Sequence, residues 1–183
     1  MDGIIPLYKE RGMTSFACVS RLRQILKTKK IGHSGTLDPG VAGVLPICVG
    51  NATKVVDYLM QSGKQYQGEL LIGVATTTQD LDGDKIEEKV VADEIPTSEI
   101  LSAMNSLTGT IVQIPPMYSA VKVNGKKLYE YARAGETVER PKRQVTISKF
   151  ELLSSKYDEK KKQQRIRFNV ECSKGTYIRT LVV

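Results

Sequence analysis

The sequence predicts an α+β fold with an antiparallel sheet. Segments with helical periodicity and segments with strand periodicity follow one another in an irregular order, without the regular alternation of a βαβ protein. The firmest strand pattern alternates apolar and polar residues, which is typical of an antiparallel sheet with one solvated face. The chain has 183 residues, enough for one well-buried domain.

The first predicted element is a helix of about fourteen residues. Thr14 and Ser15 offer an N-cap, and Val19, Leu22 and Leu26 then recur at helical spacing. Lysines follow near the end of this segment, where positive charge suits the helix dipole.

The next segment, "KIGHSGTLDPGVAGVLP" (residues 30–46), holds the chain's only histidine, His33, and an isolated carboxylate, Asp38. Four glycines and two prolines in this segment favour a loop that is neither helix nor strand. Its last residues overlap "VLPICVG", which predicts a short buried strand. "NATKVVDYLMQSG" then predicts a helix that ends at Gly63.

The middle of the chain predicts a strand in "KQYQGELLIGVAT" and a turn followed by a strand in "TTQDLDGDKIEEKVV". The three aspartates of that turn do not match a calcium loop, because Lys85 and Val91 stand where such a loop needs Gly and Glu. Thr97 or Ser98 is expected to cap a helix that runs to Gly109.

The remaining segments predict extended structure in "VQIPPMYSAVKVNG", a helix in "KKLYEYARAG" and a strand in "RIRFNVECS". In that strand four apolar residues alternate strictly with polar ones: Ile166, Phe168, Val170 and Cys172. The chain ends within an apolar run, so we expect further chain after residue 183.

The net charge of +7 is unevenly distributed. Residues 69–99 hold nine acidic and two basic residues, which leaves 25 basic against 11 acidic residues elsewhere. This asymmetry predicts a surface that faces a polyanion and an acidic segment that does not. A well-solvated basic protein with no such partner would show the same charge.

Three distant cysteines in apolar surroundings predict buried free thiols in a reducing compartment: Cys18, Cys48 and Cys172. The charged N-terminus does not resemble a signal peptide. Polar residues and a proline pair interrupt the uncharged residues 100–121, so we do not expect a membrane span there. A cytoplasmic protein is expected.

Few residues are candidates for catalysis. One histidine and three scattered cysteines supply no metal-ligand cluster, and no glycine-rich phosphate loop or nucleophile elbow occurs. An isolated carboxylate such as Asp38 can act at a sugar carbon, where positive charge develops as a glycosidic bond breaks. From spacing alone, an Asp-Pro turn is the more frequent explanation of Asp38.

Five tyrosines lie near Lys or Arg, a pairing that proteins use to stack on a base while binding phosphate. Most of them are explained equally well as core tyrosines with a hydroxyl at the surface. They are Tyr66, Tyr118, Tyr129, Tyr131 and Tyr177.

Four segments in this order closely resemble the TruB family of tRNA pseudouridine synthases: "GHSGTLDPGVAGVLPICVGNATK", "KQYQGELLIGVATTTQD", "QIPPMYSAVKVNGKKLYEYARAG" and "KGTYIRTL". The resemblance implies the pseudouridine-synthase fold, in which helices flank a mixed, mainly antiparallel sheet and the active-site cleft lies on that sheet. It also implies that residues 1–183 are an incomplete catalytic domain, without its last part and without the family's RNA-binding PUA domain.

The resemblance assigns three catalytic residues. Asp38 of the G-x-L-D-P motif matches the catalytic aspartate. Tyr66 matches the tyrosine that stacks on the flipped uracil and moves the proton at its C5. Arg179 matches the arginine that pairs with the catalytic carboxylate.

Three further residues match positions that bind RNA or substrate. His33 matches the histidine that takes part in extruding the base. Asp80 matches an acidic residue that positions the tyrosine and the RNA, and Tyr177 matches a residue that lines the pocket.

The implied reaction is the isomerisation of uridine 55 in the tRNA T loop. It needs no cofactor, because no redox change or energy input is involved. Attack at C1′, attack at C6 and proton removal at C2′ all stay open. The implied partner is the T-arm stem-loop of tRNA, and a monomer is expected.

Two alternatives stay open. The chain could be a T-arm RNA-binding or RNA-folding module with vestigial catalysis. It could also be a guide-RNA-dependent synthase that resembles dyskerin, although the basic N-terminal extension expected of such a protein is absent.

Overall fold

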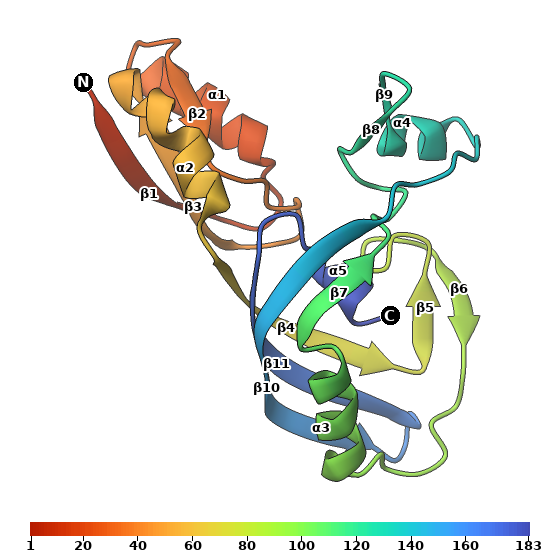
Figure 1. Cartoon of the computed structure of the whole chain (residues 1–183). Helices are drawn as coiled ribbons and strands as arrows, with labels where there is room; N and C mark the ends of the chain where they lie inside the picture. The colour runs from red at the N-terminus through yellow and green to blue at the C-terminus, as the bar shows by residue number, and fades with distance from the viewer. The chain divides into compact units, whose positions relative to one another are not determined.

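The computed structural model describes all residues from Met1 to Val183. The chain divides into two compact units, Met1–Ser62 and Gly63–Val183. In Figure 1 the first unit runs from red to orange and the second from yellow to blue. Each unit has its own sheet and its own hydrophobic core.

The N-terminal unit is built on a three-stranded sheet in the order β1-β3-β2. Both strand pairs are antiparallel, and β3 lies in the centre, so that Val49 pairs with Gly3 on one side and Ile31 on the other. The strands are β1 (Gly3–Lys9), β2 (Ile31–His33) and β3 (Gly43–Val49). The buried strand expected in "VLPICVG" is thereby confirmed.

The interpretation of residues 30–46 as a segment without strands is wrong. β2 and the first part of β3 both lie within it, and His33 is the last residue of β2. A strand of three residues is too short to show a period of two in the sequence. Its pairing with the longer β3 holds it in the sheet.

The expected first helix is confirmed as α1 (Ser15–Ile25), which is shorter than expected. Its N-cap is Thr14, whose Oγ1 accepts a hydrogen bond of 3.0 Å from the backbone N–H of Ala17. It stops where Lys27 adopts a positive φ of 49°, which ends helical geometry. Its buried residues join the strands in one core: Cys18, Val19, Ile31, Leu45, Ile47 and Val49.

The helix expected at residues 51–63 is present in two parts. A 3₁₀ helix, η1 (Gly50–Val55), leads into α2 (Val56–Gln61), and Ser62 rather than Gly63 is the C-cap. The two parts contain no buried residues.

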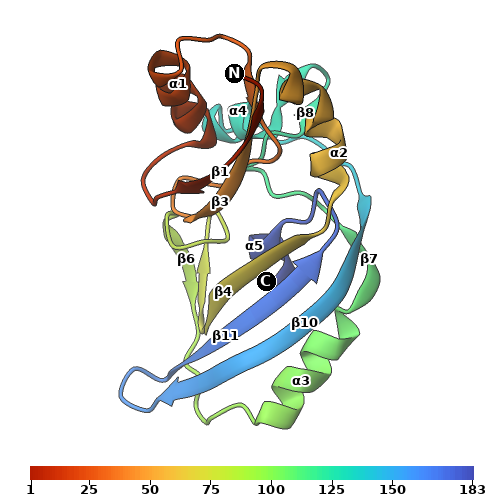
Figure 2. The same ribbon diagram turned by 90° about the vertical axis from the view of Figure 1, so that its left-hand side faces the viewer.

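The C-terminal unit is built on a four-stranded antiparallel sheet in the order β4-β11-β10-β7. Figure 2 shows β10 and β11 as the long neighbouring strands of this sheet, with α3 beside them. The elements are β4 (Lys64–Ile72), β7 (Gly109–Gln113), β10 (Arg143–Asp158), β11 (Gln163–Cys172) and α3 (Thr97–Ser106).

The strand expected in "RIRFNVECS" is confirmed as β11. Its four apolar residues, Ile166, Phe168, Val170 and Cys172, are at most 4% exposed. They pack with Ile100 and Met104 of α3 and with Leu181 of α5 (Ile178–Leu181). This core lies on one face of the sheet.

The longest strand, β10, was not expected from the sequence. Its pairing with β11 shifts register twice, between Ile147 and Lys149 and between Leu152 and Ser154. Each irregularity moves the following side chains out of phase, so the period of two that identifies a strand is lost.

Shorter elements complete the unit. The strand expected at residues 64–76 breaks at Gly73, whose φ is +102°, into β4 and β5. α3 begins at Thr97 with Pro96 as its N-cap, so a side-chain cap by Thr97 or Ser98 is wrong. The remaining elements are β5 (Val74–Thr76), β6 (Lys85–Glu88), β8 (Lys122–Val123), β9 (Lys126–Lys127) and α4 (Leu128–Arg133).

The turn and strand in residues 77–91 and the helix in residues 126–135 are confirmed by β6 and α4. The expected extended segment 112–125 is strand only at its two ends. None of the helices has the length and apolar content that crossing a membrane would require.

Candidate active site

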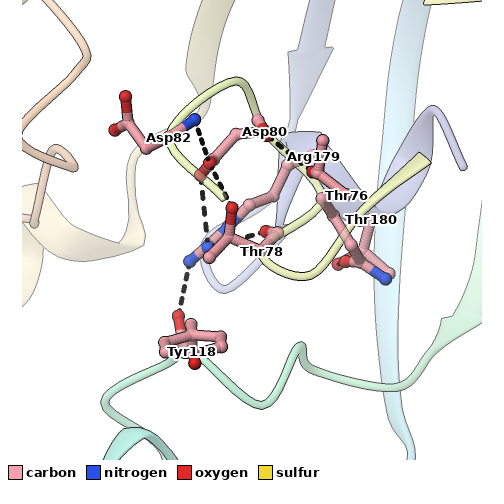
Figure 3. Close-up of polar contacts among 8 residues, drawn as sticks. Thr76, Thr78, Asp80, Asp82, Tyr118, Arg179 and Thr180 are labelled. Atoms are coloured by element: carbon pink, nitrogen blue, oxygen red, sulfur yellow. Dashed lines mark hydrogen bonds and ion pairs between the residues drawn. The ribbon is translucent and has the colours of Figure 1, made fainter. Parts of the chain in front are cut away.

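Arg179 lies at the centre of a polar network in the C-terminal unit (Figure 3). Its Nη1 donates to the carbonyl oxygen of Thr78 at 3.1 Å and lies 3.4 Å from Oδ2 of Asp80. Its Nη2 donates to the carbonyl oxygen of Tyr118 at 2.6 Å. The side chain is only 13% exposed, so these contacts hold a fixed positive charge in a largely water-free position.

The loop before β6 folds around the side chain of Asp80. The Oδ1 atom of Asp80 accepts from the hydroxyl of Thr78 at 2.5 Å and from the backbone N–H of Asp82 at 3.0 Å. The hydroxyl of Thr76 donates to the Asp80 carbonyl at 2.6 Å. Gln79 takes a positive φ of 62°, which turns the chain at this point. The threonines of this segment therefore shape the loop that presents Asp80 to Arg179.

The short helix α5 is attached to its surroundings at both sides of Arg179. The backbone N–H of Tyr177 donates to Oε1 of Gln113 at 2.8 Å, and Nε2 of Gln113 donates to the Tyr177 carbonyl at 3.0 Å. The hydroxyl of Thr180 donates to Oε1 of Gln79 at 2.7 Å. Gln113, on β7, is 6% exposed and was not among the residues singled out from the sequence. A buried amide with both hydrogen-bonding groups engaged fixes the backbone before Arg179.

Tyr66 lies on β4, opposite Val170 of β11. It is half-buried and packs against the core of the C-terminal unit. Tyr66, Asp80, Tyr177 and Arg179 therefore belong to one unit, and Asp80 and Arg179 are in direct contact.

The tyrosines of the α4 segment contact cations of their own segment. Lys126 Nζ lies 4.5 Å from the ring centre of Tyr131, whose hydroxyl donates to the Val123 carbonyl at 3.0 Å. Lys127 and Arg133 lie 5.4 and 5.3 Å from the ring of Tyr129. These two rings therefore make local cation–π contacts.

His33 lies in the N-terminal unit, where β2 ends. Its Nδ1 forms a hydrogen bond with the carbonyl oxygen of Gly35. Because a carbonyl oxygen only accepts, Nδ1 carries the proton in this contact. In the neutral ring Nε2 is then an acceptor.

Asp38 lies five residues after His33 and is half-buried. Its carbonyl oxygen accepts a hydrogen bond of 3.0 Å from the backbone N–H of Val41, which closes a turn with Pro39 at its second position. The Asp-Pro turn considered for Asp38 is thereby confirmed. The turn uses the backbone of Asp38, so it is compatible with a chemical role of the carboxylate.

The segment after Asp38 is held by Lys9, the last residue of β1, and by Gly12, which follows that strand. The backbone N–H of Gly12 donates to the Pro39 carbonyl at 2.8 Å. Lys9 is fully buried, and its Nζ donates to the carbonyls of Met13 at 2.7 Å, Glu10 at 3.1 Å and Pro39 at 3.5 Å. These hydrogen bonds satisfy the buried amino group of Lys9 and hold the loop around it in place.

The six predicted site residues therefore fall into two groups, one in each unit. The pairing of Asp38 with Arg179 that the resemblance implies stays a prediction. The contact between Arg179 and Asp80 was not predicted. No three His, Cys, Asp or Glu side chains come together in a way that could hold a metal ion.

Comparison with known proteins supports one family. The sequence model of the N-terminal domain of the TruB family of pseudouridylate synthases matches residues 23–178. A tRNA pseudouridine synthase B of Limosilactobacillus reuteri (strain DSM 20016) is 98% identical over 183 residues, which cover 100% of this chain and 61% of that protein. A tRNA pseudouridine synthase B of Levilactobacillus brevis is 62% identical over 184 residues, with the same coverage of 100% and 61%.

Solved structures agree on the fold. The chain superposes on a crystal structure of a Cbf5-Nop10-Gar1 complex with a TM-score of 0.69 and 30% identity, covering 98% of this chain and 42% of that one. A structure of an H/ACA RNP bound to a substrate RNA containing 2'-deoxyuridine gives a TM-score of 0.65 and 26% identity, covering 98% and 40%. The α+β fold expected from the sequence is confirmed.

The chain spans 61% of the length of the two curated relatives described above. The family match covers most of the chain and includes Asp38, Tyr66, Asp80 and Tyr177. The chain belongs to the TruB family of pseudouridylate synthases.

Proposed function

We propose that this chain is part of the catalytic domain of an isomerase that converts uridine 55 in the T loop of tRNA to pseudouridine. The family match and the names of the curated relatives support this proposal. The observation that carries it is the buried guanidinium of Arg179, held by Asp80 and by two backbone carbonyls. A largely buried, immobilised cation is what a site needs to bind an anionic group.

The reaction breaks the bond between N1 of uracil and C1′ of ribose and joins C5 to C1′. C5 loses one proton and N1 gains one, so atoms and charge balance without a cofactor. In this proposal the Asp38 carboxylate starts the reaction by attack at C1′, by attack at C6 or by removal of the C2′ proton. Arg179 stabilises the carboxylate as an anion, and Tyr66 stacks on the uracil and moves the C5 proton.

The substrate must leave its stack before this chemistry can take place. A uridine in a folded loop hides C1′ and C5, so the nucleotide is flipped into the site. His33 replaces part of the lost stacking, and its Nε2 offers a hydrogen-bonding position to the RNA. Asp80 positions the arginine, and Tyr177 lines the pocket.

The proposed partner is the T-arm stem-loop of tRNA, and the proposed location is the cytoplasm. The surplus of basic residues outside residues 69–99 supports a polyanionic partner. We also propose that the enzyme acts as a monomer without a guide RNA. The curated relatives at 98% and 62% identity carry the name of a tRNA enzyme, whereas the two complexes above are 30% and 26% identical.

A module that binds or folds the T-arm without catalysis is the second candidate. The basic surplus supports it as well as it supports an enzyme. The two candidates differ only in whether product forms.

The experiment uses unmodified tRNA transcript with no added metal cofactor or nucleotide. The 183-residue chain is compared with a longer version that adds the remaining part of the Limosilactobacillus reuteri relative, and pseudouridine is mapped at each position. We expect pseudouridine at position 55 and none in a transcript with cytidine at that position. Binding without product in both versions would support the RNA-binding module and contradict the proposed enzyme.

A further inference from the structure

The hydroxyl of Ser15 bridges the two backbone groups of the residue that precedes Asp38. Its oxygen accepts a hydrogen bond of 2.9 Å from the backbone N–H of Leu37, and its O–H donates one of 3.2 Å to the Leu37 carbonyl. Ser15 is 2% exposed, so water does not compete for this contact. The two residues are 22 positions apart in the sequence.

This contact fixes the peptide plane that leads into Asp38. The carbonyl of Leu37 belongs to the peptide bond between Leu37 and Asp38, and that plane helps to set the direction of the Asp38 side chain. On the other side of Asp38, the carbonyl of Pro39 accepts a hydrogen bond of 2.8 Å from the backbone N–H of Gly12. The backbone on both sides of Asp38 is therefore held by Gly12 and Ser15, both within the N-terminal unit.

Helix capping does not account for the Ser15 hydroxyl. The N-cap of α1 is Thr14, whose Oγ1 accepts from the N–H of Ala17 at 3.0 Å. Ser15 is the first residue inside the helix, and both of its side-chain contacts go to Leu37. The two adjacent hydroxyls thus make different contacts: that of Thr14 caps α1, and that of Ser15 binds the loop that carries Asp38.

We propose that Ser15 is a positioning residue, which holds the Leu37–Asp38 peptide so that the Asp38 carboxylate meets the uridine in productive geometry. This inference rests on the proposed function, in which Asp38 is catalytic. Ser15 acts through the loop backbone and does not itself touch the RNA.

Removing the hydroxyl tests this role. Ser15→Ala loses both hydrogen bonds, and the peptide before Asp38 can then rotate. We expect the single-turnover rate at saturating tRNA to fall about 10- to 100-fold, because a displacement of about 1 Å at a reacting group costs a factor of this order. The Kd for tRNA should stay within about twofold, since no RNA contact is removed.

The chain offers a matched control at the neighbouring residue. Thr14→Ala also removes one hydroxyl at the start of α1, and its loss weakens only the helix cap. We expect Thr14→Ala to lower the midpoint of urea unfolding while the single-turnover rate stays unchanged. Ser15→Thr keeps the hydroxyl on the same Cβ and should recover most of the rate lost in Ser15→Ala.

The rates and affinities of these variants show whether Ser15 has a positioning role. A rate loss in Ser15→Ala with unchanged tRNA binding and recovery in Ser15→Thr supports positioning. An unchanged rate in Ser15→Ala, or equal losses in Ser15→Ala and Thr14→Ala, overturns it. If Ser15→Ala does not fold, Ser15→Cys takes its place, because a thiol fills the space of the hydroxyl and is a much weaker hydrogen-bonding group.

Failure of this inference can be told from failure of the proposed function. All variants are made in the version of the chain that forms pseudouridine in the mapping experiment. If Asp38→Asn is inactive and Ser15→Ala turns over normally, only the role of Ser15 is overturned. If Asp38→Asn turns over normally, or if no version forms pseudouridine, the proposed function fails and the role of Ser15 fails with it.

Discussion

The guanidinium of Arg179 joins the carboxylate of Asp80, at 3.4 Å, to the backbone of two other loop residues. The carbonyls of Thr78 and Tyr118 accept hydrogen bonds from this guanidinium, from positions 101 and 61 residues away in the sequence. One side chain therefore connects the Asp80 loop, the loop before β8 and α5. Such a connection depends on the planar fork of arginine, which can donate in several directions at once.

Arg179→Lys should disrupt this connection although the charge is kept. The lysine side chain has a single nitrogen, which cannot occupy the positions of both guanidinium nitrogens. It therefore cannot donate to both carbonyls and the carboxylate at once. We expect the free energy of unfolding to fall by about 1–3 kcal/mol, because buried acceptors lose their donors. Pseudouridine formation should fall at least about 10-fold.

Urea unfolding and single-turnover kinetics measure the two effects of Arg179→Lys. Arg167→Lys, at an exposed position of β11, is the matched control and should behave like the unaltered chain. Equal behaviour of the two variants would contradict the role given to Arg179.

Gly83→Ala should distort the Asp80 loop through a steric clash. A Cβ at this position would lie 2.3 Å from Oγ1 and 2.7 Å from the backbone nitrogen of Thr78. Because Thr78 donates to Asp80 and its carbonyl accepts from Arg179, the displacement reaches both groups. We expect lower stability, by about 1–3 kcal/mol, together with slower turnover.

Gly3→Ala is the control for Gly83→Ala, since a Cβ at Gly3 would meet no atom within 4 Å. Thermal unfolding compares the two variants. A Gly83→Ala protein as stable and as active as Gly3→Ala would show that the loop adapts without cost.

Gly68→Ala should overpack the core of the C-terminal unit next to Tyr66. A Cβ at Gly68 would lie 2.5 Å from Cζ of Phe168, which is 2% exposed and packs edge-on against Phe150 with ring centres 5.5 Å apart. The ring cannot move freely, so we expect a loss of about 1–3 kcal/mol in the free energy of unfolding.

A double-mutant cycle identifies the cause of the Gly68→Ala effect. Phe168→Leu shortens the opposing side chain, so the double variant should be more stable than the sum of the two single losses predicts. Strict additivity of the two losses would mean that the glycine is needed for another reason.

The three cysteines should react slowly with thiol reagents in the folded protein. All three are buried free thiols, as the sequence predicted. Burial raises the pKa of the Cys48 and Cys172 thiols, so less of the reactive thiolate is present. Alkylation followed by mass spectrometry should show labelling rates that rise steeply with urea near the unfolding transition.

The same pKa shifts predict how stability depends on pH. The folded-state pKa values of Cys48 and Cys172 lie above those of the unfolded chain, so the unfolded chain loses these protons first as pH rises. Their contribution to stability is complete below the ordinary thiol pKa, about 8.5, and is lost above it. Urea midpoints measured between neutral pH and mildly alkaline pH should fall less when both cysteines are replaced by alanine.

Elements with a strong local pattern could be predicted from the sequence. Thr14 capped α1 as expected, and the alternation from Ile166 to Cys172 identified β11, because in both cases the side chains that reveal the element lie within it. β10 was not predicted, because its two register shifts break the alternation of apolar and polar residues. β2 was not predicted because three residues are too few to show alternation, and its pairing with β3 holds it in the sheet.

The candidate site, like the fold, could be predicted only in part from the sequence. Asp38, His33 and Arg179 stand in motifs that can be read along the chain. The hydrogen bonds of Arg179 to Thr78 and Tyr118, of Gln113 to Tyr177 and of Ser15 to Leu37 join residues 22 to 101 positions apart. Nothing in the sequence near either partner records such contacts, because only the fold brings the partners together.

Single-turnover kinetics of Asp38→Asn with T-arm RNA test whether the Asp38 carboxylate carries out the reaction. Asparagine keeps the shape of the side chain, and its backbone can keep the turn closed by Val41, but it removes the negative charge. We expect the variant to bind the RNA with an affinity within about twofold of the unaltered chain and to form no pseudouridine. Pseudouridine formation by Asp38→Asn at a rate near that of the unaltered chain would contradict it.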